Sequence, residues 1–193
     1  MTSGPSSTDA EALDRSLHRL SVLVLGVRPL VDVLGAMAEY AATAVPGADG
    51  VGVTMLRPGR PDVLAAGAHF VKWVDEVQYR VQEGPCIDAV ATRRPQICGS
   101  LGGEARWPRF GPRVGRMGVH SALSLPLLVD GQAVGALNVY AHRRDAFADD
   151  AVAAGERFAE PAAVAVVNAG SLDRAARLAQ QFESALGNRA VID

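Results

Sequence analysis

The sequence predicts an α+β domain in which a central antiparallel β-sheet carries N- and C-terminal helices on one face and loops or short helices on the other. Two apolar runs flank Asp130-Gly131 within residues 118–141. This dipeptide favours a two-residue type I′ turn, so the segment is expected to be a hairpin. Neither face of the hairpin carries charged side chains at alternate positions, as a solvent-exposed face would. Both faces of the sheet must therefore be covered by other elements. Helical periodicity on either side of the hairpin supplies the covering elements.

The first 26 residues predict a disordered tail followed by a helix. Residues 1–8 are rich in Ser, Gly, Pro and Thr, which is typical of an unstructured terminus. Residues 9–26 then place apolar side chains at helical spacing. These seam residues are Leu13, Leu17, Leu20 and Val24. A seam this narrow suits packing against one other helix, and a second chain can supply it, so we expect a dimerisation helix here.

The middle of the chain predicts a series of short elements. Pro29 cannot continue a helix interior, so a second helix begins after it. In order, we expect a helix over 30–45, a hairpin over 51–67, helices over 69–80 and 84–94, a strand over 95–101 and a long loop over 102–118. Pro85 fits the first turn of its helix, where a missing N–H costs little. The loop over 102–118 is long, and loops of this length are usually functional or mobile.

The last 45 residues predict one long helix with a defect. Asp145 or Asp149 can cap its N-terminus. Pro161 inside the helix should kink or break it, at a cost of about 3 kcal/mol unless a neighbouring element compensates. Beyond the proline, an apolar seam continues through Leu172, Ala175, Leu178, Phe182 and Leu186. Seamed helices at both ends of the chain predict a parallel dimer bundle.

Composition limits the partners and the compartment. The chain has 193 residues, 49% of them hydrophobic, and a formal net charge of −2. This balance gives a sizeable core and no general attraction to nucleic acid or an anionic membrane. No apolar run approaches the ~20 residues of a membrane span, and the N-terminus lacks a signal-peptide pattern. Two cysteines do not suggest a disulfide framework. We expect a cytoplasmic protein with no membrane partner.

Four stretches resemble, in order, the GAF domain family. They are VRPLVDVLGAMAEYAATAVPGADGVGVTML, YRVQEGPCIDAV, SALSLPLLVDGQAVGALNVYA and AFADDAVAAGERFAEPAAVAVVNA. The resemblance covers residues 27–170 and implies an antiparallel sheet of about six strands. It also implies a small-molecule pocket under the long loops, and signalling through dimerised terminal helices. The ligand and any cofactor stay unknown, because GAF domains bind cyclic nucleotides, tetrapyrroles, metals, small acids or nothing known.

Shorter motifs narrow the resemblance. EGPCIDA together with RWPRF looks like the actinobacterial GAF domains that precede an ANTAR RNA-binding domain, and ALGNRAVID (185–193) looks like the first residues of that domain. The resemblance therefore implies a sensor for transcription antitermination. Its signalling helix, residues 171–193, would lead into a missing ANTAR domain, and RNA would be contacted only through that domain.

The candidate ligand site combines polar residues of the hairpin with aromatic residues of the loops. With Val129 opposite Gln132, one hairpin face turns polar at its end. The predicted pocket floor consists of Ser121, Asn138 and Tyr140, and the predicted walls are Trp73, Tyr79, Cys86, Trp107 and Phe110. Apolar pockets with a few polar groups suit small molecules. The same aromatics can instead fill the space and leave a ligand-free dimerisation scaffold.

The two cysteines leave two hypotheses open. Cys86 lies near a predicted helix N-terminus, whose partial positive charge favours the thiolate. The redox hypothesis makes Cys86 and Cys98 a thiol-based sensor, or an enzyme similar to free methionine-(R)-sulfoxide reductase, also a GAF fold. That family uses three cysteines, and none occurs at residues 118–123, where the third would fall. The other hypothesis is that both are small buried hydrophobic residues.

No catalytic or metal signature stands out. The chain has no G-x-S-x-G, P-loop or G-x-G-x-x-G motif, and its four histidines have no ligand spacing. We therefore expect no catalytic residue, no metal site and no enzyme. Four arginines of the long loop can clamp a phosphate or carboxylate, or can form a solvated surface. They are Arg106, Arg109, Arg113 and Arg116.

Overall fold

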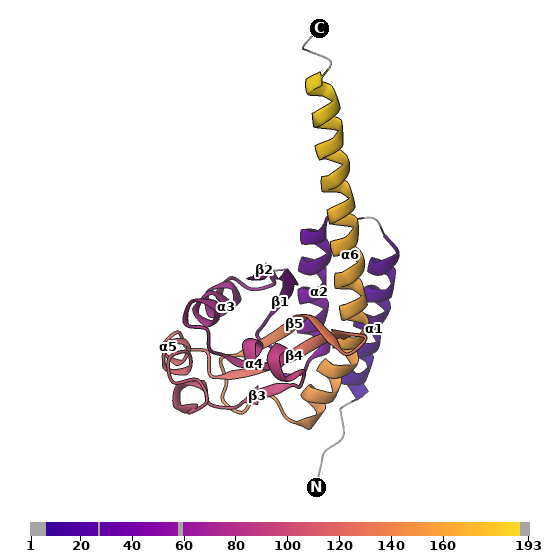
Figure 1. Cartoon of the computed structure of the whole chain (residues 1–193). Helices are drawn as coiled ribbons and strands as arrows, with labels where there is room; N and C mark the ends of the chain where they lie inside the picture. The colour runs from indigo at the N-terminus through magenta and orange to yellow at the C-terminus, as the bar shows by residue number, and fades with distance from the viewer. Residues whose placement is uncertain (1–6, 27, 58–59, 190–193) are drawn as a thin grey trace.

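One antiparallel sheet forms the centre of the molecule (Figure 1). The computed structural model describes residues 7–26, 28–57 and 60–189. In spatial order the strands are β2 (Arg60–Ala66), β1 (Gly50–Arg57), β5 (Gln132–Ala141), β4 (Ser121–Val129) and β3 (Gln96–Cys98). Every neighbouring pair is antiparallel. The α+β class and the antiparallel sheet are confirmed, but this part of the chain has five strands rather than about six.

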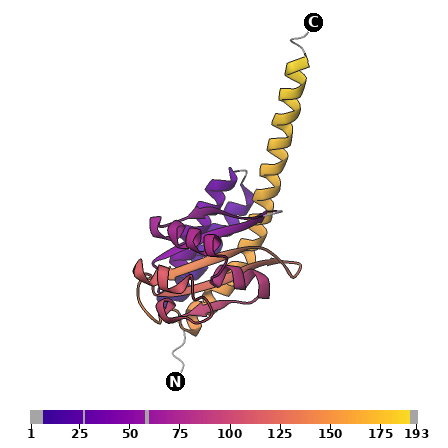
Figure 2. The same ribbon diagram turned by 60° about the vertical axis from the view of Figure 1, so that its left-hand side comes forward.

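Helices cover both faces of the sheet (Figures 1 and 2). One face carries α1 (Ser7–Leu25), α2 (Leu30–Ala44) and α6 (Asp149–Arg189). The other carries α3 (His69–Val81), α4 (Pro85–Thr92), α5 (Gly111–Arg116) and the 3₁₀ turn η1 (Leu101–Gly103). The helices at the two chain ends thus share a layer, as expected. The helix α5 and most of the turn η1 lie within residues 102–118, which we expected to be mostly loop. No helix among the described residues is both long and apolar enough to span a membrane.

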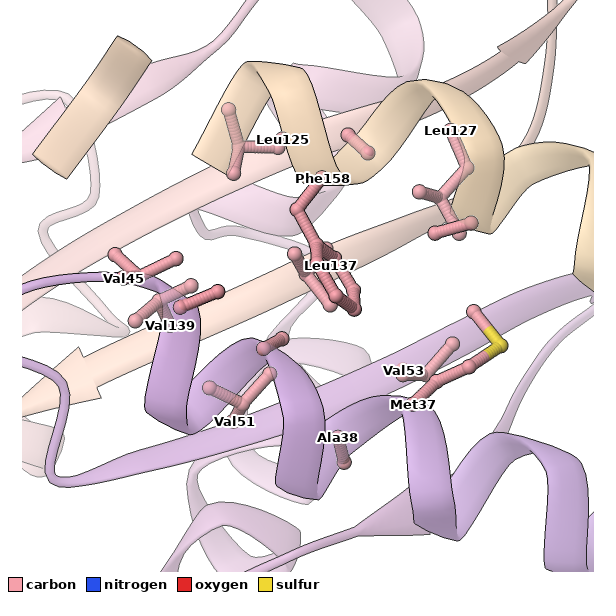
Figure 3. Packing of buried hydrophobic residues seen from close by; sticks show 14 of the residues in the cluster. Met37, Ala38, Val45, Val51, Val53, Leu125, Leu127, Leu137, Val139 and Phe158 are labelled. Atoms are coloured by element: carbon pink, nitrogen blue, oxygen red, sulfur yellow. The ribbon is translucent and has the colours of Figure 1, made fainter. Parts of the chain in front are cut away.

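The larger core lies between the sheet and the terminal helices (Figure 3). Alternate residues of β4 and β5 point into it, because side chains of a strand alternate between faces. The labelled residues are Met37, Ala38, Val45, Val51, Val53, Leu125, Leu127, Leu137, Val139 and Phe158. Fully burying one such side chain stabilises the fold by about 1.5–3 kcal/mol. This layer therefore fixes how α6 sits on the sheet.

The apolar seam of α1 packs within the chain itself. Leu13, Leu20 and Leu23 are buried against α2 and α6. The second chain that we expected to cover this seam is not required there. The helix begins at Ser7, so Ser7 and Thr8 are helical rather than part of a disordered tail. The rest of the predicted tail, residues 1–6, lies outside the described residues, as does the side chain of Val24.

The final helix α6 continues through Pro161 instead of breaking there. Phe158 and Ala162 are buried on either side of the proline, so packing on the sheet holds the helix together despite the lost hydrogen bond. Beyond Gly170 the helix leaves the domain (Figure 1). Leu172 and Leu178 are 46% and 54% exposed there. The side chains of Phe182 and Leu186, which complete the predicted seam, lie outside the described part.

An irregularity in the β4–β5 hairpin changes which residues share a face. Val129 pairs with Gln132 as predicted, but Leu127 pairs with Gly135, so Val134 has no partner. An extra residue on one strand moves every later side chain to the opposite face, because the strand period is two. Asn138 therefore lies opposite Ser124 rather than beside Ser121. The predicted face assignment is wrong from this point onward.

Candidate functional site

A cluster of polar side chains lies between the sheet and helices α3 and α4. We call it the polar cluster, and its members are Thr54, Asp75, Gln78, Tyr79, Cys86, Ser124, Asn138 and Tyr140. All except Tyr79 are buried. Burying so many polar groups is costly unless each finds a hydrogen bond. The cluster is therefore the feature of the fold that most needs an explanation.

Three adjacent strands supply the floor of the polar cluster. Ser124 of β4 lies directly opposite Asn138 of β5, and its hydroxyl donates to Asn138 Oδ1 at 3.0 Å. Asn138 Nδ2 donates to Thr54 Oγ1 of β1 at 3.1 Å. Gly135 permits this arrangement, because a Cβ at that position would overlap the carbonyl oxygen of Thr54. The hydrogen bonds of the floor thus join β4, β5 and β1 on one face.

Helix α3 supplies the roof. Asp75, Gln78 and Tyr79 are three and four residues apart, so they share the helix face that meets the sheet. Asp75 Oδ1 accepts hydrogen bonds from Tyr140 OH at 2.6 Å, from Asn138 Nδ2 at 3.2 Å and from Gln78 Nε2 at 3.3 Å. The hydroxyls of Tyr79 and Thr54 lie 2.7 Å apart.

The second carboxylate oxygen of Asp75 is unsatisfied. Oδ2 is buried and has no hydrogen-bond partner among the described residues. Burial raises the pKa of Asp75 from 3.8 to about 7, although hydrogen bonds from Tyr140, Asn138 and Gln78 act to lower it. The polar cluster contains no Lys, Arg or His, so its own members offer no cation to balance the ionised form. Neutral and ionised forms of Asp75 therefore coexist near neutral pH.

Cys86 closes the polar cluster at the start of α4. Its backbone N–H donates to Gln78 Oε1 at 2.7 Å, and its thiol lies 3.5 Å from Tyr79 OH. Gly84 has φ 145°, and a Cβ there would overlap the Gln78 side chain. Burial, and then the negative charge of Asp75, raise the pKa of Cys86 to about 11. The thiolate that the redox hypothesis requires near this helix N-terminus is thus disfavoured.

The two tyrosines of the polar cluster are neutral at all ordinary pH values. Burial raises the pKa of Tyr79 above its usual value, with further contributions from the charges of Cys86 and Asp75. Burial also raises the pKa of Tyr140, together with the nearby Asp75. Both hydroxyls consequently stay available as hydrogen-bond donors.

The structure brings together four of the eight predicted ligand residues. Tyr79, Cys86, Asn138 and Tyr140 all belong to the polar cluster. Trp73 is 53% exposed and packs its ring edge against His69. Ser121 lies on the opposite face of the sheet, where its hydroxyl donates to the carbonyl oxygen of Arg143 at 2.8 Å. It therefore holds the connection after β5 and forms no part of a pocket floor shared with Asn138.

Trp107 and Phe110 are buried beside the polar cluster rather than in its hydrogen-bond network. They belong to an apolar group with Val71, Val74 and Tyr140. The indole N–H of Trp107 donates to Asp88 Oδ2 at 2.7 Å, which anchors the loop before α5 on α4. Their rings meet edge to face with centroids 6.3 Å apart. Both residues fill the space at this end of the sheet.

Sequence reasoning missed Thr54, Asp75, Gln78 and Ser124. A signal for two of them exists in the sequence of α3. Val71, Val74 and Val81 mark its buried stripe, and Asp75 and Gln78 interrupt that stripe with polar side chains. Polar residues at apolar positions of a helix indicate a buried network. Within the part of the chain that the structure describes, no group of three His, Cys, Asp or Glu residues could hold a metal ion.

Comparison with known proteins identifies the fold. The profile of the GAF domain family matches residues 27–167. Among the curated proteins, none matches this sequence. One similar solved structure is the GAF domain of a phosphoenolpyruvate-protein phosphotransferase from Coxiella burnetii. It aligns with a TM-score of 0.67 and 18% identity over 84% of this chain and 96% of that chain.

Enzymes also share this fold. The type II free methionine-R-sulfoxide reductase from Thermoplasma acidophilum aligns with a TM-score of 0.58 and 20% identity over 71% of this chain and 92% of its own. The reductase from Neisseria meningitidis, solved with its substrate, aligns with a TM-score of 0.62 and 16% identity over 91% and 97%. These findings contradict our expectation that the chain is no enzyme. Identities this low show a shared fold and leave the reaction open.

Proposed function

This chain belongs to the GAF domain family, and on that premise we propose that it senses a small molecule at the polar cluster and relays the signal through α6. The observation that carries the proposal is the buried Oδ2 of Asp75, which has no hydrogen-bond partner among the residues that the structure describes. A buried acceptor without a donor destabilises the protein by about 1–3 kcal/mol, and more when it is charged. A ligand that brings a donor to Oδ2 removes this cost, so binding and stability are coupled.

The chemistry of the polar cluster favours a ligand with an ammonium group or a similar donor. Such a group would pair with Oδ2 and neutralise the carboxylate in one step. The hydroxyls of Tyr79 and Tyr140 and the amide of Asn138 would fix its orientation, as a few polar groups do in small-molecule sites. Gln78 is the residue that must move, because its amide bridges Cys86, Asp75 and Tyr140.

Strand β5 connects the polar cluster to the signalling helix. Asn138 and Tyr140 face the cluster, whereas Leu137 and Val139 face the core in which Phe158 of α6 is buried (Figure 3). A rearrangement around Asp75 would therefore shift the support of α6 through a single strand. Small shifts of packed helices are a common way to transmit such a change.

We propose that α6 pairs with α6 of a second chain. Leu172 and Leu178 are exposed on its protruding part, although large apolar side chains are usually covered. The seam of α1 is already used inside the chain, so the C-terminal seam carries the proposed homodimer. A helix pair that extends away from two sensor domains suits transmission to an output.

The output we propose is an ANTAR-type RNA-binding domain that controls transcription antitermination in the cytoplasm. Its support is the resemblance of EGPCIDA, RWPRF and residues 185–193 to the actinobacterial GAF domains that precede such domains. In this proposal RNA is bound by the output domain and not by the residues of the polar cluster.

Native mass spectrometry of the purified protein tests the sensor function. We expect a dimer that carries additional small-molecule mass, and we expect denaturation to release it. Asp75→Asn should lose the additional mass, because the neutral amide lacks the negative charge that balances an ammonium group. Glu76→Gln, an exposed neighbour on the same helix, is the matched control and should keep it. A dimer at bare polypeptide mass in every sample would favour a ligand-free scaffold instead.

A thiol-based function is the second candidate, favoured by the shared fold of the reductases. In that case the Cys86 sulfur takes the oxygen of a sulfoxide, which yields a sulfenic acid and the thioether. Condensation with the Cys98 thiol then gives a disulfide and water. Both cysteines are free and buried, so the polar cluster would have to open first. With dithiothreitol as reductant, Cys86→Ser should abolish turnover of methionine sulfoxide, and an unchanged rate would reject this candidate.

A further inference from the structure

A hollow lies at the end of the sheet, apart from the polar cluster. Its volume is about 320 Å³, and it is lined by Gly102, Pro112, Gly115, Arg116, His120 and Arg144. We call it the basic hollow. Its residues come from η1, from α5, from the segment before β4 and from the connection between β5 and α6. The basic side chains come from two parts of the chain, because Arg116 and His120 are four residues apart and Arg144 lies beyond β5.

Two glycines shape the basic hollow. A Cβ at Gly115 would lie 3.0 Å from the Cα of Gly102, so η1 and α5 meet backbone to backbone. A Cβ at Gly102 would meet no atom within 4 Å, so the space above this residue is open. The backbone of His120 accepts from Leu101 N at 2.8 Å and donates to Ala141 O at 2.9 Å. The floor is thus held by hydrogen bonds before any ligand arrives.

No carboxylate pairs with the arginines of the basic hollow within the described ranges. The side chains of Arg116, His120 and Arg144 make no ion pair or hydrogen bond there. The nearby carboxylate of Glu104 is held by Arg106 at 2.8 Å, and that of Asp145 lies against Gly99. The formal net charge of the chain is −2, so this basic group does not follow from a general excess of cations.

The other arginines of the loop are differently placed. Arg106 also lies over the ring of Trp107 at 4.4 Å, and Arg109 pairs with Glu83. Arg113 Nη1 donates to the carbonyl oxygen of Arg109 at 3.3 Å. Of the four arginines that the sequence marked for anion binding, Arg116 is the one that lines the basic hollow.

We propose that the basic hollow binds the phosphate group of a small phosphorylated molecule. Two guanidinium groups offer paired N–H donors that match the oxygens of a phosphate, and the imidazole of His120 adds a third donor. The volume lies near the lower end, about 300 Å³, of small-molecule sites, which suits a phosphate with a short substituent. Arg144 lies in the connection that leads into α6, so a bound anion would touch this segment directly. This site does not depend on the ligand proposed for the polar cluster.

Titration with inorganic phosphate, followed by ¹H–¹⁵N NMR, tests this site. Sodium chloride at equal ionic strength serves as the reference, because phosphate adds screening as well as binding. We expect saturable shifts confined to the residues that line the basic hollow. Arg116→Gln and Arg144→Gln should each weaken binding at least tenfold. Arg94→Gln removes an exposed arginine elsewhere and should leave binding unchanged.

A glycine pair gives an independent control of the geometry. Gly102→Leu would fill the basic hollow and should abolish the saturable shifts. Gly103→Leu adds the same side chain one residue away, where it also meets open space but lines no part of the hollow. Glycerol 3-phosphate is titrated in parallel, and tighter binding than phosphate would identify a monoester rather than the free ion as the ligand. Shifts that grow linearly, or that match those in sodium chloride, would overturn the proposal even if Gly102→Leu failed to fold.

Discussion

The hydroxyl of Tyr140 donates a 2.6 Å hydrogen bond to Asp75 Oδ1 and thereby joins the central strand β5 to helix α3. Both residues are fully buried. The bond supports one oxygen of a carboxylate whose other oxygen has no partner among the described residues. The stability of the protein, its dependence on pH and the proposed response to a ligand therefore all depend on this pair of residues.

The first prediction concerns the pH dependence of stability. The folded state raises the pKa of Asp75 from 3.8 to about 7. The stabilisation from Asp75 is complete at pH values below the pKa of Asp75 in the unfolded chain. It is lost as the pH rises from about 4 to about 7, and the free energy of unfolding changes by about 4 kcal/mol in total. Urea denaturation should show the wild-type free energy of unfolding falling across this window. Asp75→Asn should show a flatter profile and should gain stability relative to wild type as pH rises. Parallel profiles of the two proteins would contradict this assignment.

Tyr140→Phe should destabilise the protein by about 1–3 kcal/mol, because it removes a buried donor and leaves Asp75 less supported. The pKa of Asp75 should rise further, since the lost hydrogen bond acts to lower it. Urea denaturation at several pH values measures both effects. Tyr40→Phe is the matched control, because no hydrogen bond of the Tyr40 hydroxyl occurs among the described residues, where the ring packs beneath Arg19.

Phe158→Ala should cost about 3–5 kcal/mol in the free energy of unfolding, because Phe158 is fully buried between α6 and the sheet (Figure 3). Val164→Ala on the same helix should change stability little, since Val164 is 48% exposed. Thermal or urea denaturation makes the comparison. Equal losses for both variants would show that α6 is not docked as described.

The thiol of Cys86 should be strongly protected from a disulfide reagent in the native protein. It is 1% exposed, and burial raises its pKa to about 11, so the reactive thiolate is scarce. In the Cys98→Ser background, labelling of Cys86 should be at least a hundredfold slower in buffer than in denaturant. A ligand that opens the polar cluster should raise the native rate, and fast labelling without ligand would contradict the closed arrangement.

The exposed seam of α6 should hold the proposed dimer. Leu172→Asp combined with Leu178→Asp would place charges at an apolar helix contact and should yield a monomer in light scattering. Arg177→Asp changes the charge of an exposed residue on the side of the helix away from the seam and should preserve the dimer. A wild-type protein that is monomeric at micromolar concentration would reject this part of the proposal.

Much of the fold could be predicted because the signals are local. Apolar spacing marked α1, α2 and α6, and turn residues placed the two hairpins. The break between α1 and α2 follows from Pro29, whose ring fixes its own backbone. Each of these signals depends on residues that are neighbours in the chain.

The candidate site could be predicted only in part. The sequence predicted two members of the polar cluster, Tyr79 and Cys86, because they lie in a motif of the family resemblance. It predicted two more, Asn138 and Tyr140, because they lie at the polar end of the hairpin. Asp75 was missed, because its role depends on Tyr140, 65 residues away. The absence of catalytic motifs predicted that the chain is no enzyme, and the fold it shares with the reductases contradicts that prediction.

The sequence by itself determined the order and type of the elements, because helix and strand periods, proline and Asp-Gly act within a few residues. Only the tertiary structure decided which face of the sheet became polar. The unpaired Val134 shifts the register of β5, and the close approach of Gly135 to Thr54 on β1 accompanies that shift. Likewise, α6 survives Pro161 because distant strands hold Phe158 and Ala162 in the core. The first outcome involves Thr54 and Asn138, which are 84 residues apart, and the second involves strands outside the helix, so no local pattern encodes either.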